Sequence, residues 1–430
     1  MNVILGGLFA VGVQRIGITM ASESSSYDLI VFGATGFVGS ILCHYLVNQT
    51  KTQADLKWAI AGRSQAKLDK LVPSLGPNAV ALPRFIADTT DESTLRELCA
   101  QTRVIISTVG PYALYGEPLV KVCAETGTDY CDLTGEAQWI RRMMDAYGDL
   151  AQRSGARIIH CCGFDSIPSD LGVYYLQQQA QSRFGSPCVR VKMRVKGAQG
   201  GVSGGTAASG INVVKDVAAN PVLRQEFANP YSLCPDSTQS RTHPPTLIPV
   251  QYDQDFQAWI APFVMAEVNT RIVLRSHALL AQSYGTPFHY DEAILTGAGA
   301  LGWIAAQGLN AGLAGLAVAL ALPPARWLLE NTIVPASGEG PSAEAQEQGF
   351  YDLRFWGKTA DGQTIRVKVT GDRDPGYGST AKLLGQAGIS LAQDFPKSAK
   401  TGGFWTPAAM FGEVLIERLV NYAGLTFEVL

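Results

Sequence analysis

The chain has 430 residues, of which 47% are hydrophobic and 17% charged, and this predicts a packed protein of two domains or one large one. Its formal net charge is -3 and it has no run of Lys or Arg, which excludes the basic surface typical of nucleic-acid binding. The eight Cys form no C-x-x-C pair and the five His lack metal-ligand spacing, so we expect reduced thiols, a cytoplasmic location and no metal site.

Residues 1–26 precede the first predicted strand. The first nineteen are apolar and glycine-rich, but they lack the basic segment and the small-residue cleavage site of a secretory signal. We expect residues 1–26 to be a leader or a loosely held tail, with an over-extended gene start as the alternative for the part before Met20.

The next stretch has the pattern of a dinucleotide-binding turn. The apolar run Leu29 to Phe32 predicts a buried parallel strand, and Phe37 to Asn48 predicts a helix. GATGFVG between them lets the backbone turn sharply, approach a phosphate and pack the helix on the strand. We therefore predict dinucleotide binding, against the alternative of a purely structural turn. The predicted contacts are Gly33, Thr35, Gly36, Phe37, Val38 and Gly39.

The second predicted strand, Leu56 to Arg63, bears on which cofactor is bound. An NAD site usually has Asp or Glu at this strand end, whereas Arg63 and Ser64 suit the 2′-phosphate of NADP. We therefore predict NADP in preference to NAD. The alternative is an Arg63 that caps the strand or stacks on adenine, and Ser64 also suits the N-cap of a helix over Lys67 to Leu71.

The alternation of strand and helix continues to Cys161, which predicts a doubly wound parallel sheet. Asp88, which ends the third strand, is expected near the adenine, and the turn after the fourth strand is expected beside the nicotinamide, with Thr108, Gly110 and Pro111 as contacts. The predicted elements are strands Val80 to Ala87, Val104 to Thr108, Asp129 to Gly135 and Arg157 to Cys161, and helices Glu92 to Ala100, Gly116 to Glu125 and Ala137 to Ser154.

Three side chains at the ends of these strands are candidate catalytic acids. Tyr112, Asp132 and Asp165 each follow or end a strand on the side where such sheets bind ligands. Tyr112 is neutral at physiological pH, whereas an Asp would need a pKa raised by desolvation. A turn or helix-cap role is the alternative for Asp165, and Ser169 or Asp170 is expected to cap a helix over Leu171 to Ala180.

Residues 169–375 are expected to form a second α+β domain with a mixed sheet. Val189 to Val195 alternates like a half-exposed strand, and the Gly/Ser/Thr run Gly200 to Ser209 is either a phosphate-binding loop or a flexible hairpin loop. Further predicted elements are a helix over Ile211 to Ala218, a loop over Asn229 to Val250, strands over Gln251 to Trp259, a helix over Asn269 to Leu280, and a hairpin of Phe350 to Thr359 and Gln363 to Gly371.

Within this domain, residues 293–325 carry no charge. The length meets the requirement for a membrane span, but Gly, Ala, Gln307 and Asn310 dilute the hydrophobicity. A spanning helix, an interfacial hairpin and a buried Gly/Ala helix pair therefore remain open, and Trp327 would suit an interface. We expect this segment to attach the protein to a membrane or lipid surface.

Residues 376–430 are expected to form C-terminal helices that pack back on the first domain. Ser379 or Thr380 opens one helix, and Thr406 with Pro407 begins the last, which runs to Leu419.

Several motifs together resemble the saccharopine dehydrogenase-like oxidoreductases. They are GATGFVG at Gly33, AGRS at Ala61, STVGPY at Ser107, YCDLTGE at Tyr130, CGFDSIPSDLG at Cys162, GYGSTAKLL at Gly376 and GGFWTPAAMFGE at Gly402. The family includes bacterial trans-acting enoyl reductases of glycolipid assembly and animal homologues on lipid droplets. The resemblance implies a Rossmann domain over residues 27–168, a second α/β domain and lipid association, but not saccharopine as substrate.

Two functions remain open. The first is an NADPH-dependent reductase of a double bond in a lipid or polyketide intermediate, and the second is a lipid-surface protein with a structural or regulatory nucleotide site and no turnover. Short-chain dehydrogenase chemistry is disfavoured because none of the 15 Tyr has Lys four residues later. Substrate and oligomeric state are left open, with a homodimer among the options.

Overall fold

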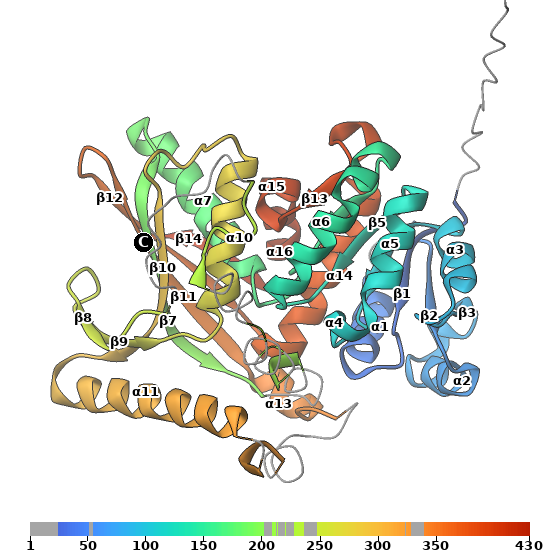
Figure 1. Cartoon of the computed structure of the whole chain (residues 1–430), viewed down its shortest axis with the longest axis horizontal. Coiled ribbons are helices and arrows are strands. Elements are labelled where there is room, and N and C mark those ends of the chain that lie inside the picture. The colour runs from blue at the N-terminus through green and yellow to red at the C-terminus, as the bar shows by residue number, and fades with distance from the viewer. Residues whose placement is uncertain are drawn as a thin grey trace, which may run out of the picture.

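The computed structural model describes residues 25–50, 55–201, 209–211, 213, 220, 228–235, 247–322, 324–327 and 339–430. Within these ranges the chain forms two seven-stranded sheets with helices packed around and between them (Figure 1). Nearly all of the expected N-terminal tail, most of the Gly/Ser/Thr run and most of the helix expected over Ile211 to Ala218 lie outside the described residues.

The first sheet is parallel throughout, in the order β13-β6-β5-β4-β1-β2-β3. Its strands are β1 (Tyr27–Phe32), β2 (Trp58–Gly62), β3 (Arg84–Ile86), β4 (Thr102–Ser107), β5 (Asp129–Asp132), β6 (Arg157–Ile159) and β13 (Gly403–Trp405). Because apolar runs in β1, β2 and β4 are buried on both faces, they read as continuous hydrophobic segments rather than as alternating ones. The doubly wound Rossmann sheet predicted from the sequence is confirmed.

Helices cover both faces of this sheet. They are α1 (Phe37–Gln49), α2 (Gln65–Ser74), α3 (Glu92–Ala100), α4 (Tyr112–Tyr115), α5 (Glu117–Thr126) and α6 (Ala137–Ser154). One apolar core includes side chains of α1 and α2 and continues into the second sheet, and the other lies under α3, α5 and α6. The bounds of α3 and α6 are those predicted, and Ser64 caps α2 by accepting from the Lys67 N–H.

The second sheet is mixed, in the order β14-β12-β11-β7-β10-β9-β8, with β7 and β10 its parallel pair. Its strands are β7 (Cys188–Gln199), β8 (Gln251–Asp253), β9 (Ala258–Pro262), β10 (His289–Gly297), β11 (Phe350–Thr359), β12 (Thr364–Gly371) and β14 (Leu425–Val429). The predicted hairpin is confirmed as β11 and β12. Helices α7 (Ile167–Phe184) and α10 (Ala266–Leu279) pack on the face turned toward the first sheet (Figure 1).

The C-terminal residues contribute a strand to each of the two sheets. Helix α14 (Thr380–Gln393) follows a turn at Pro375–Ser379 and packs on α1, β1, β4 and β5, which confirms the expected return to the first domain. The sequence did not predict that β13 would extend the first sheet or that β14 would close the second. The last predicted helix is two helices, α15 (Pro407–Phe411) and α16 (Glu413–Tyr422), because Gly412 has φ +52° between them.

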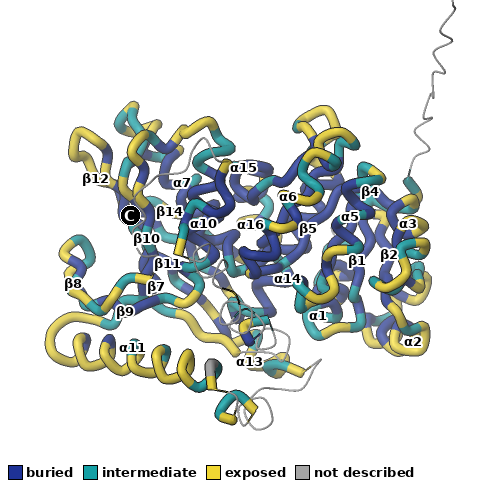
Figure 2. The backbone as a smooth tube through the Cα atoms, in the orientation of Figure 1, coloured by how far each residue is buried: buried dark blue, intermediate teal, exposed yellow. Residues whose placement is uncertain are grey.

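Two further helices lie outside the main packing. Helix α13 (Ala343–Gln348) is capped by the Ser342 hydroxyl, which accepts from the Ala345 N–H. Helix α11 (Gly299–Ala321) follows β10 directly and is exposed along nearly its whole length (Figure 2). The described residues of the uncharged segment thus form the end of a strand, one long helix and, from residue 324, the start of a further helical stretch.

Candidate active site

The glycine turn between β1 and α1 cannot accept side chains at two positions. Gly33 has φ +87°, and a Cβ there would lie 2.6 Å from Val109 Cγ2. A Cβ on Gly39 would lie 2.2 Å from the Gly33 carbonyl oxygen. The glycines therefore let the helix, the strand and the β4 turn meet at contact distance.

The N-terminus of α1 opens to the surface at this turn. Gly36 is exposed and no side chain caps the helix, so the first N–H groups of α1 can bind an anion. Thr35, Phe37 and Val38 are partly buried around them. The Phe37 ring packs edge-on against Tyr377 with centroids 5.2 Å apart. An uncapped helix N-terminus directly after a glycine turn is the arrangement that holds a pyrophosphate in dinucleotide-binding proteins.

Charged groups follow at the ends of β2 and β3. Arg63 is exposed and, within the described part of the chain, has no hydrogen-bond or ion-pair partner. Asp88 accepts from the N–H and hydroxyl of Thr90, and these bonds, aided by the Arg63 charge, lower the pKa of Asp88. The Ser64 hydroxyl is used to cap α2. An available guanidinium at this strand end suits the 2′-phosphate of NADP.

The turn after β4 is tied to the glycine turn. The Thr108 hydroxyl lies 3.2 Å from the Phe32 carbonyl oxygen and 3.1 Å from that of Gly33, so it joins β4 to the end of β1. Gly110 is exposed and Pro111 partly buried at the same edge. The structure therefore brings the predicted contacts of β1 and β4 together.

Tyr112 points into the protein. Its hydroxyl donates to the Ser107 carbonyl at 3.0 Å and lies 3.5 Å from the Leu133 N–H, and its ring packs on Trp139. Only 3% of the residue is exposed, and burial raises its pKa well above 10.0. These contacts favour a packing role over the predicted proton donation, because the phenol has no open path to a ligand.

Asp132 is enclosed as well. Its Oδ2 accepts from the Tyr130 hydroxyl at 2.9 Å and pairs with His160 Nδ1 at 2.7 Å, and its Oδ1 accepts from the Thr134 N–H. Asp132 has no exposed surface. Since Cys131 pairs with Ile159, Asp132 and His160 are cross-strand neighbours, a proximity that the sheet order could have indicated. The geometry favours a structural pair.

Asp165 differs from the other two candidates. It is partly exposed in the loop between β6 and α7, and among the described residues it has no hydrogen-bond or ion-pair partner. Its Oδ2 lies over exposed Gly135, in the loop after β5, where a Cβ would come within 3.3 Å. Desolvation raises its pKa to about 6. Of the three predicted acids, Asp165 is therefore the one placed to reach a ligand.

Asp170 and Ser169 do not cap α7, because the helix begins at Ile167, earlier than predicted. Asp170 instead accepts from the Ala408 N–H at 2.8 Å and so supports the start of α15. Asn269 donates to Ser169 and to Glu292 Oε2, and it accepts from Ser166. The start of α7 is thus fixed by a buried polar network from the second domain.

Glu136 is a buried carboxylate beside the β4 turn that we did not predict. Its carboxylate accepts from the N–H groups of Tyr112 and Ala113, both at 2.9 Å, and from the Ser209 hydroxyl at 3.0 Å. Burial raises its pKa. It follows β5 within the YCDLTGE motif, so its place at the carboxyl end of a parallel strand was an available signal. Glu136 links the β4 turn to a segment of the second domain.

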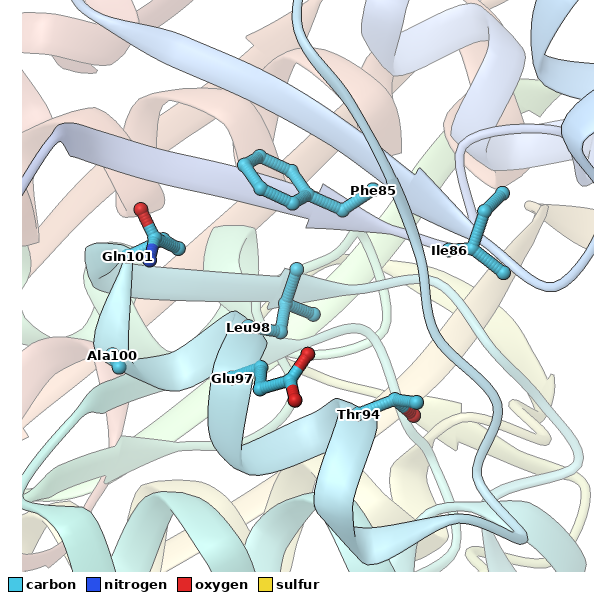
Figure 3. A pocket seen from close by; sticks show the side chains of 7 residues that line it. All are labelled: Phe85, Ile86, Thr94, Glu97, Leu98, Ala100 and Gln101. Carbon is cyan, nitrogen blue, oxygen red and sulfur yellow. The ribbon is translucent and has the colours of Figure 1, made fainter.

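A hollow of about 350 Å³ lies elsewhere on the first domain (Figure 3). It is bordered by β3 and α3 and lined by Phe85, Ile86, Thr94, Glu97, Leu98, Ala100 and Gln101. None of these residues belongs to the predicted cofactor contacts. The candidate site is therefore defined by the strand ends and not by this hollow.

Comparison with known proteins agrees with this geometry. Residues 29–159 match the family described as the saccharopine dehydrogenase NADP binding domain. The chain is 37% identical over 410 residues to the trans-acting enoyl reductase of Mycobacterium tuberculosis and 36% identical over 413 residues to that of Mycobacterium leprae. Each alignment covers 93% of this chain and 97% of the relative.

A solved structure shows the same fold. Apo saccharopine dehydrogenase (L-Glu forming) from Saccharomyces cerevisiae superposes with a TM-score of 0.51 at 14% identity, covering 94% of this chain and 99% of that one. Identity this low supports the fold alone. Taken with the glycine turn, the open α1 N-terminus and Arg63, the matches show that the chain is an NADP-binding oxidoreductase of the saccharopine dehydrogenase-like family that includes the trans-acting enoyl reductases.

Proposed function

We propose that the protein is an NADPH-dependent enoyl reductase acting on a double bond in a lipid or polyketide intermediate of glycolipid biosynthesis. The observation that carries this is Asp165, a partly buried, unpaired acid within the described structure, at the carboxyl edge of an NADP-binding sheet. The long alignments with enzymes named trans-acting enoyl reductases support the reaction type.

In this proposal, one group of residues binds the cofactor and Asp165 donates the proton. Bound NADPH would supply the hydride for the carbon β to the substrate carbonyl, and the protein would have to deliver a proton to the α carbon. The α1 N-terminus and Arg63 would hold the phosphates, and the β4 turn at Gly110 would orient the nicotinamide half. Asp165 would give its proton to the α carbon and regain one from water, leaving a saturated product and NADP⁺.

The raised pKa of Asp165 supports this role. With a pKa of about 6, the side chain still holds a proton in roughly a tenth of molecules at pH 7, whereas an ordinary Asp would hold almost none. Its remaining contact with solvent allows reprotonation. Tyr112 and Asp132 stay predictions as donors, with their hydroxyl and carboxyl groups engaged inside the protein.

The test is a reduction assay on the full chain. We expect NADPH oxidation in the presence of a long-chain trans-2-enoyl thioester, with a saturated product and, from NADPH deuterated at the transferred position, one deuterium at the β carbon by mass spectrometry. Tight NADPH binding without turnover on this substrate or on a lipid extract would instead support the alternative of a nucleotide site with a structural or regulatory role.

A further inference from the structure

Helix α11 is unusual in composition. It has 23 residues, Gly299–Ala321, and no charged residue lies between Glu292 and Arg326. At about 1.5 Å per residue it is roughly 35 Å long. Among the described helices it is the one whose length and hydropathy would allow a membrane crossing. Length alone does not distinguish a core helix from a lipid-binding one.

Exposure makes this distinction. Only 6% of its most apolar stretch is buried, whereas a core helix would be buried for most of its length. Leu301 is 81% exposed, and Ile304 and Val318 are each 58% exposed. In Figure 2, α11 is coloured as exposed along its length, in contrast to α10 and α14. The helix also lies in the middle of the chain, so it is not a signal sequence.

The large exposed side chains are distributed around the helix. At 100° per residue, Leu301, Trp303, Ile304, Leu309, Leu316 and Val318 spread over most of the circumference. The buried stripe, with Gly302 and Ala306, packs against β9 and β10. The free sides of the helix are therefore mainly apolar, with Gln307 as an exposed polar side chain among them, and such a surface needs an apolar environment on all its free sides. A lipid phase provides this, whereas a protein partner would cover one side.

The sheet holds the start of the helix in place. The Thr296 hydroxyl lies 3.0 Å from the Trp259 carbonyl oxygen and 2.8 Å from that of Gly302. A Cβ on Gly302 would lie 2.1 Å from the Gly297 carbonyl oxygen, so the first turn packs directly on the end of β10. The direction of α11 is therefore set by the second sheet.

The strand order excludes a single membrane crossing. Strand β10 precedes α11 and β11 follows it, and both pair with β7. A single crossing would put β10 and β11 on opposite sides of a membrane, which this pairing forbids. The sequence between α11 and Glu339 contains Arg326 and Glu330 and is shorter than the about 20 apolar residues of a second crossing. The helix must therefore stay on one side.

We propose that α11 lies in the plane of a lipid surface, submerged in a single leaflet, and attaches the protein there. Trp303 and Trp327 are 45% and 64% exposed, and Arg326 follows the apolar stretch, as suits the boundary between acyl chains and headgroups. The protein body covers the stripe that would face water in an ordinary amphipathic helix. This binding needs no specific headgroup.

The anchor also points to how substrate arrives, a step that rests on the proposed function. In Figure 1, α11 runs along the lower side of the molecule. The chain after α11 reaches the cofactor turn, since a Cβ on Gly340 would lie 2.4 Å from the Phe37 ring. The enzyme then takes a lipid-dissolved enoyl substrate from the surface that it binds.

Vesicle binding tests the anchor without turnover. With NADPH-loaded full-length protein and neutral phosphatidylcholine vesicles, the triple variant Leu301→Glu, Ile304→Glu, Val318→Glu should lower the partition coefficient by at least about a hundredfold. The matched control Val80→Glu, Val414→Glu, Val420→Glu changes three exposed apolar residues with the same charge and should bind like the parent. Unchanged NADPH affinity shows that both variants fold.

Three results would overturn the proposal. The parent protein could fail to bind vesicles, the two triple variants could bind equally well, or α11 could mediate a dimer, seen by ultracentrifugation, that the α11 variant abolishes while vesicle binding persists. The depth of Trp303 is a further check. Its fluorescence, obtained as the difference between the parent and Trp303→Phe, should be quenched more by lipids brominated near the headgroups than by lipids brominated near the bilayer centre. Vesicle binding without enoyl reduction would count against the proposed function and leave the anchor standing.

Discussion

The two sheets differ in what they expose. At the carboxyl edge of the first sheet, polar groups are open: the α1 N–H groups, the Arg63 guanidinium and the Asp165 carboxyl. In the second sheet, charged groups such as Arg194 and Asp253 are buried and paired, with a hydrogen bond of 2.9 Å, and the long exposed element is the apolar α11. The first sheet therefore offers groups for binding and chemistry, and the second offers a surface for attachment.

Asp165 and Asp170 show the same difference within one segment. Both carboxyls have pKa values raised by burial, to about 6 and about 7. Asp170 accepts from Ala408 and has no exposed surface, whereas Asp165 is partly exposed and has no partner among the described residues. A raised pKa alone therefore does not mark a catalytic acid, and access to a ligand decides between them.

We expect the largest effect from a substitution that disrupts the cofactor-binding edge of the first sheet and leaves the second sheet intact. Gly39→Ala would place a Cβ 2.2 Å from the Gly33 carbonyl oxygen, so α1 must move away from β1. We expect NADPH affinity to fall by at least about a hundredfold and the free energy of unfolding by about 1 to 3 kcal/mol. Titration calorimetry and urea unfolding measure these changes.

Gly148→Ala is the matched control, since a Cβ there meets nothing within 4 Å in helix α6. It should bind NADPH like the parent and be equally or slightly more stable. Normal NADPH binding by Gly39→Ala would show that the turn does not hold the cofactor.

The second prediction concerns the buried carboxylates of the second domain. Burial raises the pKa of Glu292 to about 7, and Tyr290 and Asn269 donate to its oxygens. Because the folded pKa exceeds the unfolded one, folding retains a proton that the unfolded chain releases above about pH 4.5. The free energy of unfolding should therefore fall as the pH rises from about 4.5 to about 7, by on the order of 3 kcal/mol from this group.

Glu292→Gln should lose this share of the pH dependence while binding NADPH normally. Urea unfolding at several pH values measures it, with Asp170→Asn as a parallel case for the other buried acid. An identical pH dependence in the parent and Glu292→Gln would mean that Glu292 ionises in the folded protein as readily as in the unfolded chain.

We expect the smallest effect from a substitution of Arg63, which tests whether this residue contacts the 2′-phosphate of NADPH. Arg63→Ala should weaken NADPH binding by roughly ten- to a hundredfold and NADH binding little, because charge-assisted hydrogen bonds contribute about 1.5 to 3 kcal/mol. Arg84→Ala, which breaks a surface ion pair with Asp69, serves as the control. Equal losses for both cofactors would place Arg63 away from the 2′-phosphate.

Sequence reasoning recovered the first sheet because its signals are local. Strands β1, β2 and β4 contain short apolar runs, a helix follows each of them within a few residues, and Gly33 and Gly39 mark the turn by type. The second domain depends on distant pairings, and β13 and β14 join two different sheets from neighbouring positions in the chain. No local pattern specifies which sheet such a strand joins.

Local sequence patterns also could not distinguish among the three candidate acids. Position at a strand end identified Tyr112, Asp132 and Asp165 alike. The partners that enclose the first two include Leu133 and His160, which become neighbours only when the sheet forms. Helix α7 begins at Ile167, before the predicted cap at Ser169 or Asp170, and Pro168 lies in its first turn, where proline is common.

The most direct measurement is single-turnover NADPH oxidation by the parent and Asp165→Asn across pH, with the long-chain enoyl thioester as substrate. The parent rate should be highest below about pH 6 and fall about tenfold per pH unit above it, because the reaction needs the protonated acid. Asp165→Asn should bind NADPH normally yet react about a hundredfold more slowly, without this pH dependence. A variant that reacts at the parent rate with the parent pH profile would show that Asp165 is not the proton donor.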